Sequence, residues 1–207
     1  MGLFDFLKKD SKENVQQDSS TEVSNVNKEI EKTEQSDNSD IQFGNYKQGS
    51  NGEIKPIEWI KIDEENDSVL LISRFCLDIK AFHEPSGEIT WEDCTLRKYL
   101  NNEFLSSAFN NEEQEKIQNN PNGDKVFLLS KDEVLKYLNN GRGAGATLYA
   151  IANGAYSNNT QGNNWWWLRS QSDQKYFADV VSNDCSFTGM AVNSSHVTIR
   201  PAIWIKK

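Results

Sequence analysis

Apolar side chains are unevenly placed along this chain, and their pattern divides it into two parts. Residues 8–40 hold four aliphatic residues and no aromatic one, whereas aromatic and β-branched residues come densely from Ile41 onward. A segment so poor in apolar side chains cannot bury enough surface to offset the entropy lost on ordering. We therefore expect a disordered, acidic and polar linker over 10–40, and a single globular domain over 41–207.

The first part of this domain has the alternation of apolar and polar residues that is typical of half-buried strands. Three segments show it or form a short apolar run: IQFGNY at 41–46, IEWIKI at 57–62 and VLLI at 69–72. The acidic segment 63–67 between the last two is a hairpin turn candidate. These segments predict an antiparallel meander.

Helical signals follow in the middle of the domain. Apolar residues recur every four positions from Leu96 to Ala108, behind Thr95 as a plausible N-cap. Ser130 and Glu133 have capping-box spacing, which predicts a helix that ends at about Leu138. We also expect a short helix over 111–118, a buried strand over 126–129 and one short helix within 147–155.

The last 45 residues or so are expected to be all β. Four apolar segments separated by polar turns lie at 165–170, 177–181, 187–192 and 197–205. The order is thus strands, helices and strands again. This order predicts an α+β fold, mostly antiparallel sheet with two or three short helices, and not a Rossmann-type alternation.

Several of these segments also resemble a known family in sequence. The matching blocks are FGNYKQG (43–49), PIEWIKID (56–63), LLISRFCLD (70–78), ITWEDCTLRKYLNNEF (89–104), KVFLLSKDEVLKYL (125–138), WWLRS (166–170) and IRPAIWI (199–205). In this order they resemble a bacterial domain family of unknown function, number 6273, over essentially all of 43–205. The resemblance implies a fold and no established activity.

Two short segments depart from the pattern of that family. Residues 198–201 read Thr-Ile-Arg-Pro where the family usually has Gly-Val-Arg-Pro. The turn at 182–184 reads Ser-Asn-Asp where the family usually has a glycine. Both changes keep the expected strands and leave the geometry of their turns open.

The WWLRS and RPA blocks are similar, more distantly, to C-type-lectin-like domains and to the formylglycine-generating enzyme group. Those folds imply paired terminal strands, flanking helices and a long loop region that presents ligands. The enzyme chemistry uses a closely spaced C-terminal cysteine pair, whereas this chain has only Cys185 in its C-terminal half. The triplet 84–86, Glu-Pro-Ser, lacks the amide of a lectin calcium site and precedes the first helix. We therefore expect neither chemistry.

Charge and cysteine usage narrow the function further. The net charge is −9 and no cluster of lysine and arginine stands out, which disfavours nucleic acid as a partner. The three cysteines, Cys76, Cys94 and Cys185, are far apart and form no CxxC pair, so we expect free thiols, no metal site and no cofactor. Free thiols favour a reducing cytoplasm.

The N-terminal segment 1–9 has a pattern of its own. Leu3, Phe4 and Leu7 would share one face of a short helix followed by two lysines. The segment is too short for a secretory signal, and no stretch approaches the ~18 apolar residues of a membrane span. It is either a weak hook for a membrane surface or a partner groove, or a frayed terminus.

Candidate ligand contacts come from the aromatic and polar residues of the C-terminal half. Trp165 and Trp167 would face one side of a strand and Trp166 the other, so two would be core anchors and one a platform for a sugar or protein. Arg169 and Arg200 are either partly buried guanidiniums that bond carboxylates and carbonyls, or an anion site. His83 and His196 stand in no recognisable nucleophile motif.

These residues predict a non-catalytic binding or interaction module for a protein or a glycan. Its surface would be built from the loops around 139–165 and 182–196, where Asn and Ser gather. The alternatives are an enzyme with an unrecognised carboxylate or thiol site and a structural assembly component. The expected ligand-binding residues are Trp165, Trp166, Arg169, Asn183, Asp184, Asn193 and Arg200.

Overall fold

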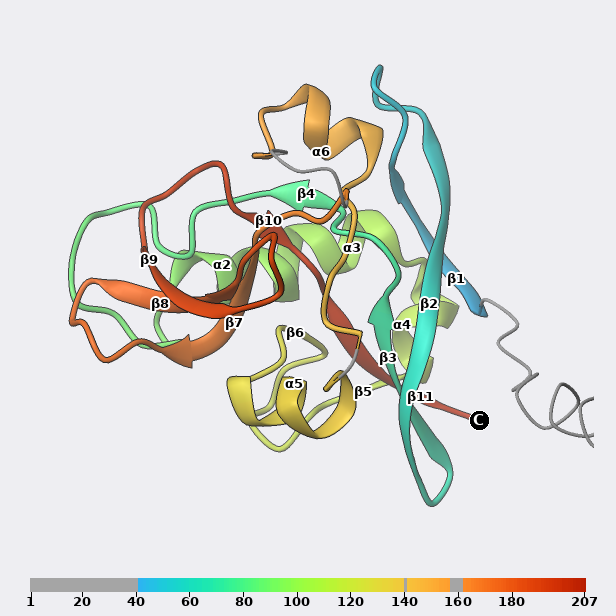
Figure 1. The fold of residues 1–207 in the computed structure, drawn as a ribbon. Coiled ribbons are helices and arrows are strands. Elements are labelled where there is room, and N and C mark those ends of the chain that lie inside the picture. Colours follow the sequence, from blue (N-terminus) through green and yellow to red (C-terminus); the bar gives the residue numbers. More distant parts are fainter. Residues whose placement is uncertain (1–40, 140, 157–161) are drawn as a thin grey trace, which may run out of the picture. The chain divides into compact units, whose positions relative to one another are not determined.

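The structure of the chain is a computed structural model that describes residues 41–139, 141–156 and 162–207 (Figure 1). Strands come first, then helices, then strands again, as the sequence pattern predicts. The expected linker over 10–40 and the expected hook over 1–9 lie outside the described residues.

The first sheet contains the opening meander and the end of the chain. Its strands run in the order β1-β2-β3-β11-β5, with β6 also paired to β11, and every pair is antiparallel. The predicted hairpin turn falls at Asn66, which has a left-handed φ of 46°. The strands of this sheet are β1 (Ile41–Lys47), β2 (Ile54–Glu65), β3 (Ser68–Ser73), β5 (Ile117–Gln118), β6 (Val126–Phe127) and β11 (Ala202–Lys206).

The second sheet runs in the order β4-β10-β7-β8-β9. Three of its four pairings are antiparallel, and β10 runs parallel to β7, where Thr198 lies beside Trp166. The predicted mostly antiparallel α+β architecture is therefore confirmed, with one parallel exception. Its strands are β4 (Asp78–Ile79), β7 (Trp166–Gln171), β8 (Phe177–Val181), β9 (Phe187–Ala191) and β10 (Thr198–Ile199).

The single strand expected over 197–205 is wrong, because the chain changes sheets in its middle. Pro201 has no N–H for a ladder bond, and pairing stops at Arg200 and Pro201 between β10 and β11. The segment from β3 to β4 changes sheets alongside it. The amide of Ser73 donates to the carbonyl of Pro201, and that of Leu77 to the carbonyl of Ile199, both at 2.9 Å.

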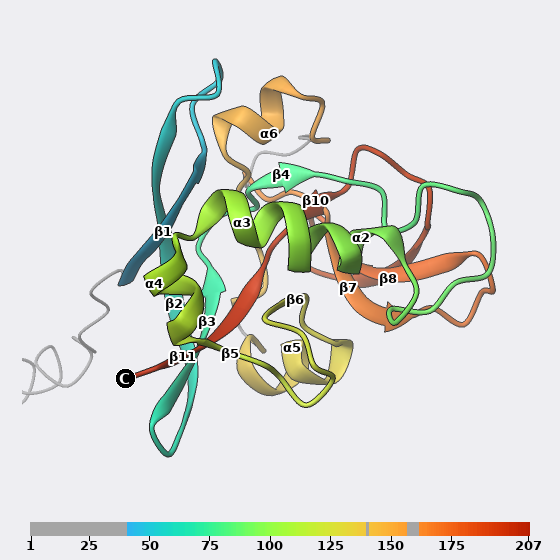
Figure 2. The ribbon, with the colours of Figure 1, turned by 180° about the vertical axis from the view of Figure 1, so that it is seen from behind.

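Helices connect the two sheets. The long stretch predicted from Leu96 to Ala108 is present, with a π-helical middle, and Figure 2 shows it running from the side of β1, which α3 contacts, toward β7 and β8. Its N-cap is Cys94 and not Thr95: the Cys94 sulfur accepts from the Arg97 amide, while the Thr95 hydroxyl accepts from Glu84. The helices are α2 (Thr95–Tyr99), η1 (Leu100–Phe104), α3 (Leu105–Ala108), α4 (Asn111–Lys116), α5 (Lys131–Tyr137) and α6 (Leu148–Ala152).

Local signals explain where α5 and β6 begin and end. The capping box of Ser130 and Glu133 is formed as predicted, and α5 starts directly behind it. The strand expected over 126–129 is shorter, because its last carbonyls have other donors. The Arg169 guanidinium donates to the Leu128 carbonyl, and its backbone amide donates to the Leu129 carbonyl.

Buried apolar side chains from both sheets and the long helix form one continuous cluster. On the first sheet Phe109 contacts Phe104 and Trp59, and on the second sheet Phe82 contacts Trp167. Within the described parts of the chain, no helix combines the length and the apolar character that a membrane crossing requires.

Candidate functional site

An apolar hollow of about 390 Å³ opens beside Trp165, the residue directly before β7. We call it the aromatic cleft; it is lined by Tyr156, Trp165, Met190, Ser194, His196 and Val197. Four of these six side chains are aromatic or aliphatic. The cleft thus lies among the loops from which the sequence predicted a ligand surface.

Hydrogen bonds hold Trp165 in one orientation. Its carbonyl accepts from both the amide and the hydroxyl of the buried Thr198, at 2.9 and 2.6 Å. Its indole N–H donates to the Asn183 side-chain oxygen at 3.1 Å. The half-buried ring therefore presents an apolar face without a polar atom left to satisfy. Asn183 contributes to this site as a positioning residue.

Hydrogen bonds also hold the part of the cleft lined by Tyr156 and His196. Asn164, only 1% exposed, donates to the Tyr156 carbonyl at 2.9 Å and accepts from the Ala146 amide. The His196 ring Nδ1 lies 3.0 Å from the Gly154 carbonyl oxygen. The exposed Tyr156 ring meets Trp165 edge-on, with centroids 6.5 Å apart. The walls are thus held by bonds within the protein, which lowers the ordering entropy of binding.

Trp166 and Arg200 are not on this surface, which corrects their place among the expected ligand contacts. Trp166 is fully buried and donates to the Arg142 carbonyl, and Arg200 is 2% exposed. The guanidinium lies 5.2 Å from the Trp166 ring and donates to the Ser73 carbonyl at 3.0 Å. Arg200 therefore bonds the two segments that change sheets to each other, and the Trp166 ring packs against its guanidinium.

Arg169, Asp184 and Asn193 also lie outside the lining of the cleft. Arg169 forms a bidentate pair with Glu133, the capping residue of α5. Asp184 closes its own turn, where hydrogen bonds from Ser182 and Ser186 lower the pKa of its carboxyl to about 2. Asn193 is an exposed residue of the turn after β9.

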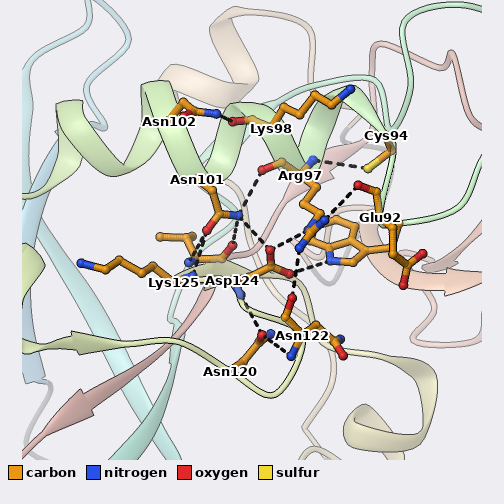
Figure 3. Close-up of polar contacts among 12 residues, drawn as sticks. Glu92, Cys94, Arg97, Lys98, Asn101, Asn102, Asn120, Asn122, Asp124 and Lys125 are labelled. Carbon is orange, nitrogen blue, oxygen red and sulfur yellow. Dashed lines mark hydrogen bonds and ion pairs between the residues drawn. The ribbon is translucent and has the colours of Figure 1, made fainter.

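A second polar cluster joins the long helix to the turn before β6 (Figure 3). We call it the clamp; its centre is the carboxylate of Asp124, which is 2% exposed. Arg97 Nε donates to one oxygen of this carboxylate at 2.6 Å, and Trp91 Nε1 donates to the other at 2.9 Å. The ion pair is therefore buried on its acidic side and half-exposed on its basic side.

The remaining polar atoms of the clamp bond the backbone. The other Arg97 nitrogens donate to the carbonyls of Glu92 and Asn122. Asn101 donates to the Val126 carbonyl and accepts from two amides of the same strand segment (Figure 3). These bonds are made within the protein, so we interpret the clamp as a structural device and not as a ligand site.

A groove that no sequence pattern indicated lies between β1, β4 and the long helix. Tyr46 donates its hydroxyl to the Asp78 carboxylate at 2.7 Å, and its hydroxyl oxygen lies 2.8 Å from that of Tyr99. Burial and the Asp78 charge raise the pKa of Tyr46, and burial raises the pKa of Tyr99 to about 12. Both phenols therefore stay protonated at neutral pH.

Two of the three thiols that a catalytic site could use are buried, and both histidines are hydrogen-bonded within the protein. Burial raises the pKa of Cys76 and of Cys94 to about 11, so neither is a thiolate nucleophile at neutral pH. All three cysteines are free thiols. His83 accepts from the Thr95 amide. In the described residues no three histidine, cysteine or acidic side chains gather as metal ligands.

Comparison with known proteins identifies the family and nothing closer. No curated protein and no solved structure matches the chain. A family model described as "Domain of unknown function (DUF6273)" matches residues 66–207. This range contains the clamp, the aromatic cleft and both sheets except β1 and β2. The chain therefore belongs to the DUF6273 family of domains.

Proposed function

We propose that this domain is a non-catalytic binding module that takes an apolar side chain of a protein or peptide into the aromatic cleft. The observation that carries the proposal is the geometry of Trp165, whose carbonyl is held by Thr198, whose indole N–H is held by Asn183 and whose side chain lines an open hollow. Fixed aromatic side chains in pockets are typical energetic centres of protein interfaces.

The composition of the lining favours a peptide over a sugar. A sugar presents several hydroxyl groups, and each needs a hydrogen-bonding partner when it is buried. The cleft offers few polar groups, chiefly those of Ser194, His196 and Tyr156. An aliphatic or aromatic side chain buries its surface there without such a requirement.

The position of the cleft supports the more distant likeness to C-type-lectin-like folds as part of the same proposal. Tyr156 comes from the loop after α6, and Ser194 and His196 from the loop between β9 and β10. In this proposal the loops present the ligand surface while the paired strands hold them. The three free thiols support a reducing compartment such as the cytoplasm.

The test is a selection on the full chain with a random peptide display library, run in parallel with a glycan array. We expect enriched peptides that share one aliphatic or aromatic anchor, and at least tenfold weaker binding by Trp165→Ala. Tyr176→Ala is the matched control, because this tyrosine is 55% exposed and lies outside the cleft lining. Enrichment of glycans alone, or equal binding by Trp165→Ala, would contradict the proposal.

A further inference from the structure

The groove around Tyr46, Asp78 and Tyr99 has a volume of about 330 Å³, near the lower end of the range for small-molecule sites. We call it the tyrosine groove. It is lined by Asn45, Tyr46, Lys47, Ile54, Asp78, Lys80, Tyr99, Glu103, Ser107 and Tyr149. A further hollow of about 290 Å³ shares Lys80, Tyr99 and Glu103 and continues along the helix.

The hydrogen atoms of the groove can be assigned from its hydrogen bonds. A carboxylate only accepts, so the single hydroxyl hydrogen of Tyr46 goes to Asp78. The contact between the two phenols must then use the hydrogen of Tyr99. The hydroxyl hydrogens of Tyr46 and Tyr99 are therefore both committed, and these two phenols and Asp78 present only lone pairs to the groove. This part of the groove suits a ligand group that donates.

The charge of Asp78 also favours a ligand group that donates hydrogen bonds. Asp78 is 7% exposed, and its donors within the described residues are neutral: the Tyr46 hydroxyl and the Ile79 amide. No ion pair of Asp78 occurs among those residues. A buried carboxylate without a cation is unfavourable, so a ligand cation would gain the interaction that the described residues do not supply. Glu103, also in the lining, adds a second carboxylate.

The lysines of the groove show where the rest of the ligand would lie. Lys80 Nζ is 4.4 Å from the centroid of the Tyr99 ring, and Lys47 Nζ is 5.5 Å from that of Tyr149. These ammonium groups make a purely cationic ligand unfavourable and suit a carboxylate. Ile54, which is 67% exposed, supplies an apolar surface in the same lining.

We propose that the tyrosine groove binds a small zwitterion of the amino-acid class. The ligand ammonium donates to Asp78 and to the lone pairs of Tyr99, and the ligand carboxylate pairs with Lys80 or Lys47. An aliphatic side chain then rests on Ile54. This site is independent of the aromatic cleft, because the two share no lining residue.

The experiment is a titration of the full chain, followed by NMR, with three probes: L-leucine, L-leucinamide and N-acetyl-L-leucine. We expect leucine to bind with a Kd on the order of 1 mM, as suits a ligand of its size. Leucinamide lacks the carboxylate and N-acetylleucine lacks the ammonium, so each should bind about tenfold more weakly or not at all. No saturable shift with leucine, or N-acetylleucine binding as tightly as leucine, would overturn the proposal.

Two variants test whether leucine binds in the tyrosine groove. Asp78→Asn removes the charge and keeps an oxygen that accepts from Tyr46, and we expect at least a tenfold loss of leucine affinity. Tyr99→Phe removes one hydroxyl from a half-buried ring and serves if Asp78→Asn fails to fold. Trp165→Ala should bind leucine unchanged, which separates this proposal from the function of the aromatic cleft. Unchanged affinity in Asp78→Asn and Tyr99→Phe would contradict the assignment.

Discussion

The clamp and the aromatic cleft use similar side chains for opposite purposes. In the clamp, Asp124 accepts from a tryptophan and an arginine, and the arginine also binds two backbone carbonyls (Figure 3). In the cleft, the hydrogen bonds of Trp165 lie on its backbone and on the nitrogen of its ring, so the ring face stays available. The clamp stabilises the fold because its donors bond acceptors within the protein. The aromatic cleft is suited to binding because its hydrogen bonds fix an apolar ring face in an open hollow.

Three arginines of the sequence blocks follow the first pattern. Arg97, Arg169 and Arg200 each donate to backbone carbonyls, and the first two also pair with buried or half-buried carboxylates. These three arginines therefore stabilise the fold. The residues that distinguish one ligand from another would lie in the loops, where substitution leaves the core intact.

The largest expected effect is on stability, from breaking the clamp. Asp124→Ala leaves the donors of Arg97 and Trp91 without their acceptor, and we expect the free energy of unfolding to fall by about 3–5 kcal/mol. Chemical denaturation measures it. Glu53→Ala is the control, because its ion pair with Lys55 is exposed on both sides and should contribute at most about 1 kcal/mol. Equal losses of stability for the two substitutions would contradict the view that the clamp stabilises the fold more than an exposed ion pair does.

Two neighbouring tryptophans, Trp165 directly before β7 and Trp166 at its start, should separate stability from binding. Trp166→Ala opens a cavity under the Arg200 guanidinium, and we expect a loss of about 3–5 kcal/mol in the free energy of unfolding. Trp165→Ala should cost about 1 kcal/mol, because its ring is half-buried. The same denaturation experiment decides; a larger loss for Trp165 would place it in the core.

A smaller effect should follow from loosening the indole without removing it. Asn183→Ala deletes the acceptor of the Trp165 N–H, and we expect peptides selected on the native chain to bind about fivefold more weakly, in line with one hydrogen bond. Calorimetric titration gives the affinity. Asn193→Ala, in an exposed turn outside the lining, is the control and should leave binding unchanged.

The smallest expected effect concerns a carboxyl that belongs to neither region. Burial raises the pKa of Asp179 above its ordinary value of 3.8, so its charged form is penalised in the fold. Asp179→Asn removes the penalty, and its melting temperature should exceed that of the native chain at pH 7. The difference should shrink as the pH falls toward 4, because the native carboxyl then takes up its proton. A difference that grows with falling pH would contradict this account.

Local signals predicted most of the fold. The capping box at Ser130 and the turn at Asn66 depend on residues close in sequence, and both form as expected. The change of sheets at Pro201 was signalled by the proline, but an apolar run on both sides suggested one continuous strand. Which sheet receives each half depends on pairing with β3 and β4, more than 100 residues earlier.

The candidate sites depend even more on contacts between residues that are distant in the sequence, so local signals predicted them less well than the fold. Loop composition indicated the neighbourhood of the aromatic cleft, and Trp165 was one of its expected residues. The burial of Trp166 was not decided by alternation along the strand, since both faces of β7 are covered. The tyrosine groove brings together Tyr46, Asp78 and Tyr99 from three separate elements, and no spacing in the sequence connects them.

The most direct test of the central claim is a double-mutant cycle between Trp165 and the anchor residue of a selected peptide. Affinities are measured for the native chain and Trp165→Ala, each with the native peptide and with its anchor changed to alanine. If the anchor lies in the aromatic cleft, the two substitutions should be coupled by at least about 1 kcal/mol. Fully additive losses would show that the anchor binds elsewhere and would contradict the proposed function.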